Sequence, residues 1–112
     1  MIVTDRLSLN TKLITATYAL TEEDCIIKNN NGAINVTNTL PPITNLIEGH
    51  TVFIGRGRPS TGTITIALGA GATGVQALAG TVGVTTSIGT HNATGAGLGA
   101  MFTKIGTIWY RF

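Results

Sequence analysis

The sequence predicts an all-β domain, an antiparallel β-sandwich or jelly roll, with an extended N-terminal arm. Eight or nine short segments rich in β-branched residues recur at a spacing of roughly 8–12 residues. Gly, Asn and Pro separate these segments, and twenty threonines add to the strand preference. No window carries a helical stripe longer than two turns. At 112 residues, the chain is long enough for one core.

The first half divides into an arm and five strands. Residues 1–12 have few apolar positions and mixed charge, which predicts the arm, and residues 13–112 then form a single domain. The expected strands cover residues 12–20, 25–28, 33–37, 50–54 and 63–68. Asn29–Gly32 predicts a turn, because Asn and Gly tolerate positive φ. Pro41 and Pro42 exclude a central strand and favour an extended crossing or an edge position.

The second half predicts four further strands separated by glycine-rich turns. They cover residues 75–78, 81–88, 98–104 and 107–112. In the last strand, alternation places Ile108, Tyr110 and Phe112 on one face. Trp109 and Arg111 lie on the other face. We expect Trp109 to pack in the core, with stacking on a sugar as the alternative role.

Charge is scarce and unevenly placed. Charged residues make up 11% of the chain, against about 25% in typical soluble domains. No Asp, Glu, Lys or Arg occurs from Pro59 to Thr103. The first 48 residues carry a net charge of −2 and the remainder +4. Because a soluble surface normally carries charge, we expect this half to face protein in an oligomer or a larger assembly.

Two arginines flank Gly57 in a predicted loop. Arg56 and Arg58 are placed to hold a carboxylate on a neighbouring subunit, or a phosphate or acidic glycan. A solvated hairpin tip is the other interpretation. The predicted interface residues are therefore Arg56, Arg58 and Trp109.

The glycine-rich motifs do not predict a nucleotide site. Gly69–Gly74 matches G-x-G-x-x-G, but a β-rich stretch follows it and no acid occurs after Glu48. Gly57–Thr63 has the spacing of a P-loop, with Thr where the phosphate-binding Lys belongs. We expect both segments to be loops.

The sequence predicts no catalytic, cofactor-binding or metal-binding residues, and so no enzyme. His50, His91 and Cys25 form no close ligand pair, and a single cysteine excludes an intrachain disulfide. A net charge of +2 is too small to indicate nucleic-acid binding. Ile64–Val84 is apolar but contains five glycines, which argues against a membrane span, and residues 1–12 lack the pattern of a signal peptide.

Four segments follow one another in a characteristic order: Ala33–Pro42 (AINVTNTLPP), Glu48–Ile54 (EGHTVFI), Gly62–Ile66 (GTITI) and Lys104–Phe112 (KIGTIWYRF). They resemble virion surface proteins of tailed bacteriophages, namely fibre modules and small capsid-decoration proteins. The shared order is a strand ending in Leu-Pro, a glycine turn, two β-branched strands and a closing Gly-x-x-Trp. The resemblance spans residues 18–112 and implies an all-β, commonly trimeric subunit on the particle exterior.

Within that class, the length of the chain favours a capsid decoration or cement protein. Such a protein binds where shell subunits meet, which implies the major capsid protein and sister copies as partners. We therefore expect it on the capsid surface of the virion, after synthesis in the host cytoplasm. The alternative is a trimeric fibre or head-fibre module that binds a host receptor or surface carbohydrate.

Overall fold

The structure is a computed structural model that describes residues 9–57, 61–77, 82–83, 85–89 and 99–112. These residues form short strands and one 3₁₀ helix, η1 (Ile43–Asn45). The strands are β1 (Thr11–Ile14), β2 (Tyr18–Ala19), β3 (Ile26–Asn29), β4 (Val36–Thr39), β5 (Thr51–Arg56), β6 (Ile64–Ala67), β7 (Gly74–Ala77), β8 (Val82–Gly83), β9 (Thr85–Gly89), β10 (Gly99–Ile105) and β11 (Ile108–Arg111).

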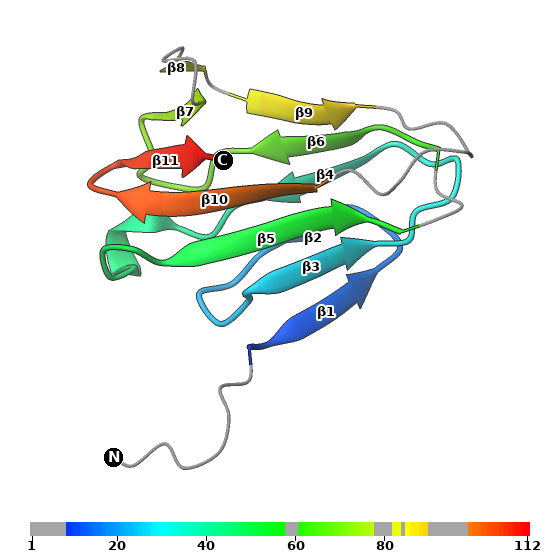
Figure 1. Cartoon of the computed structure of the whole chain (residues 1–112), viewed down its shortest axis with the longest axis horizontal. Helices are drawn as coiled ribbons and strands as arrows, with labels where there is room; N and C mark the ends of the chain where they lie inside the picture. The colour runs from blue at the N-terminus through cyan, green and yellow to red at the C-terminus, as the bar shows by residue number, and fades with distance from the viewer. Residues whose placement is uncertain (1–8, 58–60, 78–81, 84, 90–98) are drawn as a thin grey trace.

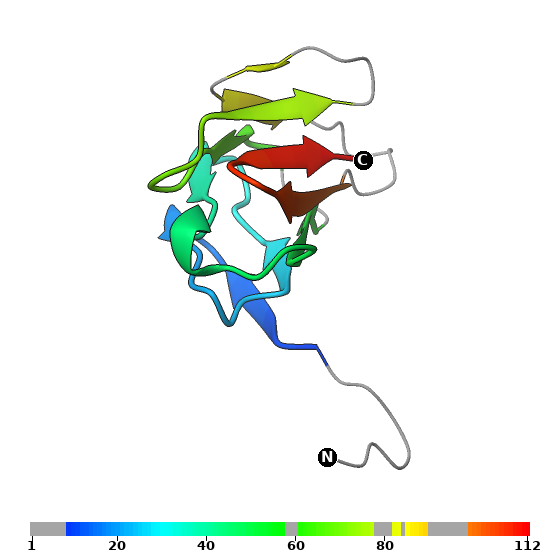
Figure 2. The same cartoon turned by 90° about the vertical axis from the view of Figure 1, so that its left-hand side faces the viewer.

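The strands form two sheets around one core (Figures 1 and 2). The seven-stranded sheet has the order β1-β3-β5-β10-β11-β7-β8, and the four-stranded sheet the order β2-β4-β6-β9. From β1 to β6, successive strands alternate between the sheets, so the chain winds as a coil. Each turn of the coil adds one strand to each sheet, parallel to the strand of the previous turn.

The all-β class is confirmed, but the strand directions differ from the expected antiparallel arrangement. Five of the pairings between described strands are parallel: β1–β3, β3–β5, β2–β4, β4–β6 and β7–β11. Antiparallel pairs are β5–β10, β10–β11, β6–β9 and β7–β8. A parallel pair needs a crossover, and for the four parallel pairs among β1 to β6 the intervening strand in the opposite sheet provides it. The alternation of apolar and polar residues along a strand indicates which face is buried. It does not indicate whether the neighbouring strand runs parallel or antiparallel.

The first expected strand, residues 12–20, divides between the two sheets. β1 ends at Ile14, the chain bends at Thr15 and Ala16, and β2 begins at Tyr18. Residues 1–8 of the expected arm lie outside the described residues. The last arm residues belong to the fold, since Thr11 and Lys12 pair with β3.

The turn expected at Asn29–Gly32 is present, but it lies slightly later in the chain, at Asn31–Ile34. Ile34 N–H donates to Asn31 O at 3.0 Å, and Gly32 has φ +57°, which explains the glycine. After Pro41 and Pro42 the chain enters η1 rather than a strand.

Stacked turns of the coil approach so closely that two corners require glycine. A Cβ atom at Gly62 would lie 2.1 Å from the Ile34 carbonyl oxygen. A Cβ atom at Gly69 would lie 2.1 Å from the Leu40 carbonyl oxygen. These glycines flank β6 on both sides, so they allow the third turn of the coil to settle directly on the second.

The core is filled by inward side chains from both sheets. The largest fully buried apolar residues are Trp109, Phe102, Ile27, Leu40, Ile43, Ile54, Ile64, Ile66 and Val52. Each such side chain contributes about 1.5–3 kcal/mol when it leaves water. Because side chains from both sheets are buried in the same core, the hydrophobic effect holds the two sheets together.

One polar contact crosses this core. Asn29 on β3 and Asn38 on β4 are both fully buried and exchange reciprocal amide hydrogen bonds of 2.7 and 3.1 Å. Asn29 also donates to the Gly55 carbonyl at 3.2 Å. The pair therefore joins one sheet to the other, and each amide satisfies its partner in a place that water does not reach.

Replacing one member of this pair should destabilise the domain. Asn38→Ala leaves the Asn29 amide oxygen buried without its donor, which costs about 1–3 kcal/mol of unfolding free energy. The double variant Asn29→Ala/Asn38→Ala should cost less than the sum of the two single changes. Urea unfolding measures all three, with exposed Asn45→Ala as a control expected within about 0.5 kcal/mol of wild type. Additive single effects would contradict the reciprocal pairing.

Candidate interaction surface

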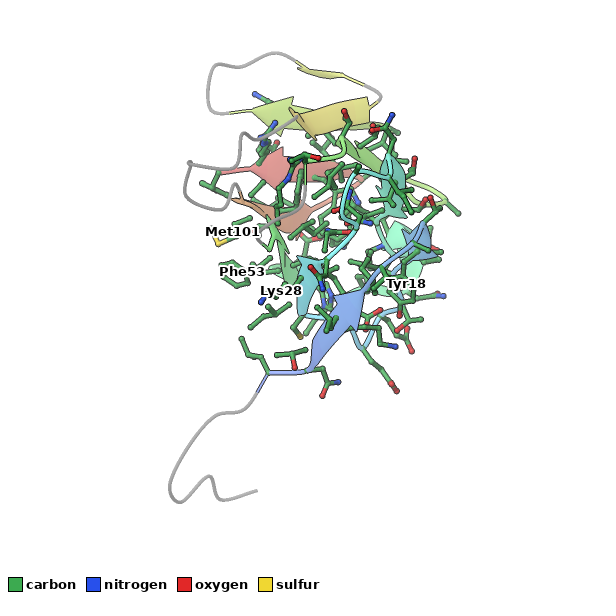
Figure 3. All side chains as sticks on the ribbon, turned by 90° about the vertical axis from the view of Figure 1, so that its right-hand side faces the viewer. Tyr18, Lys28, Phe53 and Met101 are labelled. Atoms are coloured by element: carbon green, nitrogen blue, oxygen red, sulfur yellow. The ribbon has the colours of Figure 1, made fainter. Side chains whose placement is uncertain are left out.

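A row of exposed and half-buried apolar side chains crosses the outer face of the seven-stranded sheet. Strand register places Ile26 beside Phe53, and Phe53 beside Met101. Phe112 continues the row, because it exchanges backbone hydrogen bonds of 2.8 and 3.4 Å with Met101. We call Ile26, Phe53, Met101 and Phe112 the apolar row. Figure 3 shows Phe53 and Met101 projecting outward on the same side as Lys28, with Tyr18 on the opposite side.

A shallow groove lies beside this row. In the next row of the same face, Lys28 is in register with Gly55, and Gly55 with Gly99. The two glycines present no side chains, so they leave a groove of about 470 Å³ bordered by the apolar row and Lys28. We call Gly55 and Gly99 the glycine trough.

The outer faces of both sheets are almost without charge. In the described strands, alternation places one charged side chain, Lys28, on an outer face. The outer face of the four-stranded sheet carries Thr37, Thr39, Thr65 and Ala67. In the described strands, these two faces offer packing surface and hydroxyl groups.

A second groove lies at the carboxyl ends of β2, β4 and β6. It measures about 600 Å³, and its lining includes Leu20, Leu40, Pro42, Asn45 and Glu22. The lining combines apolar side chains with single polar groups and contains no aromatic ring. Its residues therefore do not define a particular ligand.

The structure describes two of the three predicted interface residues, Arg56 and Trp109. Arg56 ends β5 with its side chain directed inward and is 5% exposed, and burial lowers its pKa. Trp109 has no exposed surface, in agreement with the core role, so the alternative role in sugar stacking has no exposed ring to support it. Arg58 lies outside the described residues. Of these residues, Arg56 and Trp109 are therefore both buried in the described part of the chain.

The sequence interpretation missed the apolar row, although a signal was present. Val52, Phe53 and Ile54 are consecutive apolar residues, as are Ala100, Met101 and Phe102. Successive strand residues point to opposite faces, so such a run places apolar side chains on both. Val52 and Ile54 are buried while Phe53 is 41% exposed.

A carboxylate fastens the β10–β11 hairpin to the connection before β5. Glu48 accepts hydrogen bonds from Lys104 Nζ at 2.5 Å and from the Gly106 N–H at 2.9 Å. These donors hold the pKa of Glu48 below its usual value. The contact positions the hairpin that carries Met101 and Trp109.

The acidic turn at residues 22–24 closes the end of the core next to β1 and β2. Tyr18 Oη and the Thr21 N–H both donate to Asp24 Oδ2 at 2.8 Å, and Asp24 is buried. The Lys12 ammonium lies 5.1 Å from the centre of the Tyr18 ring. Lys12 lies on β1, the edge strand of the seven-stranded sheet. A charged lysine on an edge strand discourages the strand from pairing with another chain.

The described residues offer no cluster of metal-ligating side chains. Within the described residues, no three His, Cys, Asp or Glu side chains gather in a way that could hold a metal ion. Gly69–Gly74 makes a turn that leads into strand β7 rather than into a helix. Cys25 is a half-buried free thiol, and His91 lies outside the described residues. The described part of the chain contains no helix long and apolar enough to span a membrane.

No protein-family model, no curated protein and no solved structure matches this chain. The role of the outer sheet faces and of the second groove is therefore inferred from the chemistry of their own residues.

His50 should make folding sensitive to pH between about 7 and 5. Burial lowers its pKa below 6.5, and the backbone of Asp24 and the charge of Glu22 only partly offset this. The unfolded chain therefore binds the proton first, so unfolding free energy falls as pH falls through this range. In urea titrations across this pH range, His50→Gln should flatten that dependence. An unchanged slope in His50→Gln would contradict this assignment.

Proposed function

We propose that this chain is a structural protein of a tailed-phage particle. In this role it decorates the capsid surface, binds the major capsid protein where shell subunits meet, and associates with sister copies as a homotrimer. It performs no catalysis and needs no cofactor, nucleic acid or membrane. Its action is mechanical, because each contact adds binding free energy that the bare shell lacks.

The observation that carries this proposal is the lack of charge on the outer faces. The described strands place Lys28 alone among charged residues there, beside a row of large apolar side chains in which Phe53 and Phe112 are exposed. Soluble monomers rarely expose a contiguous apolar patch of more than a few hundred Å². A surface of this composition is suited to contact with other protein subunits.

The receptor-binding fibre module remains the alternative function, with less support from the surface. Trp109 is fully buried and Arg56 is 5% exposed, so neither presents a binding group to a glycan. The second groove contains no aromatic side chain on which a sugar ring could stack. Contacts between subunits account better for what is exposed.

The proposal predicts that the chain binds phage heads and stabilises them. Heads of the parent phage prepared without this chain should capture purified chain in a sedimentation assay. They should then release DNA at a higher temperature than bare heads, because binding stabilises the assembled shell by mass action. The decoration role would be refuted if the heads capture no chain and release their DNA at the same temperature as bare heads.

The arm should contribute to attachment rather than to folding. Deleting residues 1–8 leaves β1 intact, including Thr11 and its pairing with Ile26. We expect weaker capture by heads with an unchanged urea midpoint. Deleting residues 1–12 is a poor test, because it also removes half of β1. Equal capture by the 1–8 deletion and the full chain would exclude an attachment role for the arm.

A further inference from the structure

We propose that the second groove, at the carboxyl ends of β2, β4 and β6, receives residues 1–8 of a neighbouring copy of this chain. We call these residues the distal arm. The inference rests on the self-association within the proposed function and names the contact through which the copies assemble. Each copy gives its distal arm to one neighbour and receives that of another, and such head-to-tail contacts close into a ring when the rotation fits. A ring of three is the homotrimer.

The groove has the size and the lining to hold a short extended peptide. Ala19, Pro42 and Ala70 line it and are exposed, and its volume is about 600 Å³. Pockets of about 300–1,000 Å³ hold ligands the size of a drug, which is also the size of a peptide of a few residues. The groove crosses the ends of three neighbouring strands, so it extends over about 10 Å from β2 to β6. About three extended residues span that distance.

The sequence of the distal arm matches this groove in length and polarity. The arm begins with Met-Ile-Val and continues with Thr-Asp-Arg-Leu-Ser. Three apolar residues therefore lie at the end farthest from β1, and polar residues separate them from the folded domain. Eight extended residues reach about 26 Å, which is enough to cross to another subunit and lay the apolar end across its groove.

Opposite charges support the same pairing. Glu22 is the one charged residue among those that line the groove, and it is exposed at the end of the groove next to β2. Arg6 follows the apolar end of the distal arm by three residues. With residues 1–3 across the groove, the long side chain of Arg6 can reach the Glu22 carboxylate and bind it with paired hydrogen bonds. Asp5 then points away from Glu22, because successive residues of an extended segment point to opposite sides.

The start of β1 directs the distal arm away from the groove of its own subunit. The Asn10 side chain donates to the Glu23 carbonyl at 2.9 Å, and the Asn10 carbonyl accepts from the Ile26 N–H at 2.9 Å. Leu9, just before it, is 44% exposed. Figure 2 shows β1 leading away from both sheets toward its start, whereas η1, which lies beside the groove, is on the other side of that view. The arm is therefore placed to meet the groove of a neighbour.

Two variants test the distal arm and the groove separately. Deleting residues 1–8 removes the arm and keeps the groove. Ala70→Trp fills the groove, and Ala70 is an exposed turn residue, so the fold has room for the larger side chain. Ala16→Trp is the matched control, because Ala16 is an exposed alanine in a bend that does not line the groove.

Sedimentation velocity over a concentration series measures assembly, and circular dichroism confirms that each variant is folded. We expect wild type and Ala16→Trp to assemble at low micromolar concentration. The deletion and Ala70→Trp should each need about tenfold or more concentration to do so. Arg6→Glu and Glu22→Arg should each weaken assembly, and the two changes in one chain should restore it, because every contact then pairs the reversed charges.

A mixture of the two variants gives the decisive measurement. The Ala70→Trp chain still carries a distal arm, and the deletion chain still has an open groove. One chain of each kind can therefore form a single contact, while a ring cannot close. We expect a heterodimer in the mixture at concentrations where each variant alone is monomeric. A mixture without a heterodimer would overturn the inference.

The other outcomes separate this inference from the proposed function. Unchanged assembly of both folded variants would overturn the groove contact and leave self-association intact. At concentrations below assembly, a lower urea midpoint after deletion of residues 1–8 would place the arm in its own groove and overturn the exchange between copies. A monomeric wild type that still binds heads would overturn the inference and the trimer while leaving the decoration role. Heterodimers from chains that no head captures would support the contact and refute decoration.

Discussion

The structure depends on a hydrophobic core that both sheets share turn by turn. Because β1 to β6 alternate between the sheets, each turn of the coil contributes inward side chains to both walls. Ile27 and Ile54 line one wall, and Ile64 and Ile66 line the other. Neither sheet can bury its inner face without the other, so the coil and the core form together.

This shared core imposes local requirements that the chain meets in two ways. Stacked corners come too close for a Cβ atom, and Gly62 and Gly69 occupy those positions. A polar side chain directed inward must find a partner inside, and the Asn29–Asn38 pair provides it across the two sheets. Two glycines and two asparagines, residue types typical of loops, therefore support the regular part of the fold.

Successive residues of a strand point alternately into the core and out to the surface, so the strand sequences also determine which side chains are exposed. Each inward apolar residue has an outward neighbour, and at Phe53 and Met101 the outward neighbour is also apolar. The structure gathers four such residues from positions 26, 53, 101 and 112 into one row. An exposed row of this kind is unfavourable in a lone subunit, and contact with protein removes it from water. The proposed role in an assembly follows from this balance.

The sequence by itself determined the all-β class and the approximate position of most strands, because residue alternation and turn-forming residues are local signals. It also indicated that Trp109 packs in the core and that the chain is short of surface charge. Tertiary structure alone decided that β1, β3 and β5 run parallel, that Arg56 points inward and that the apolar row exists. These features depend on which strands become neighbours, and residue periodicity along one strand carries no information about its neighbour.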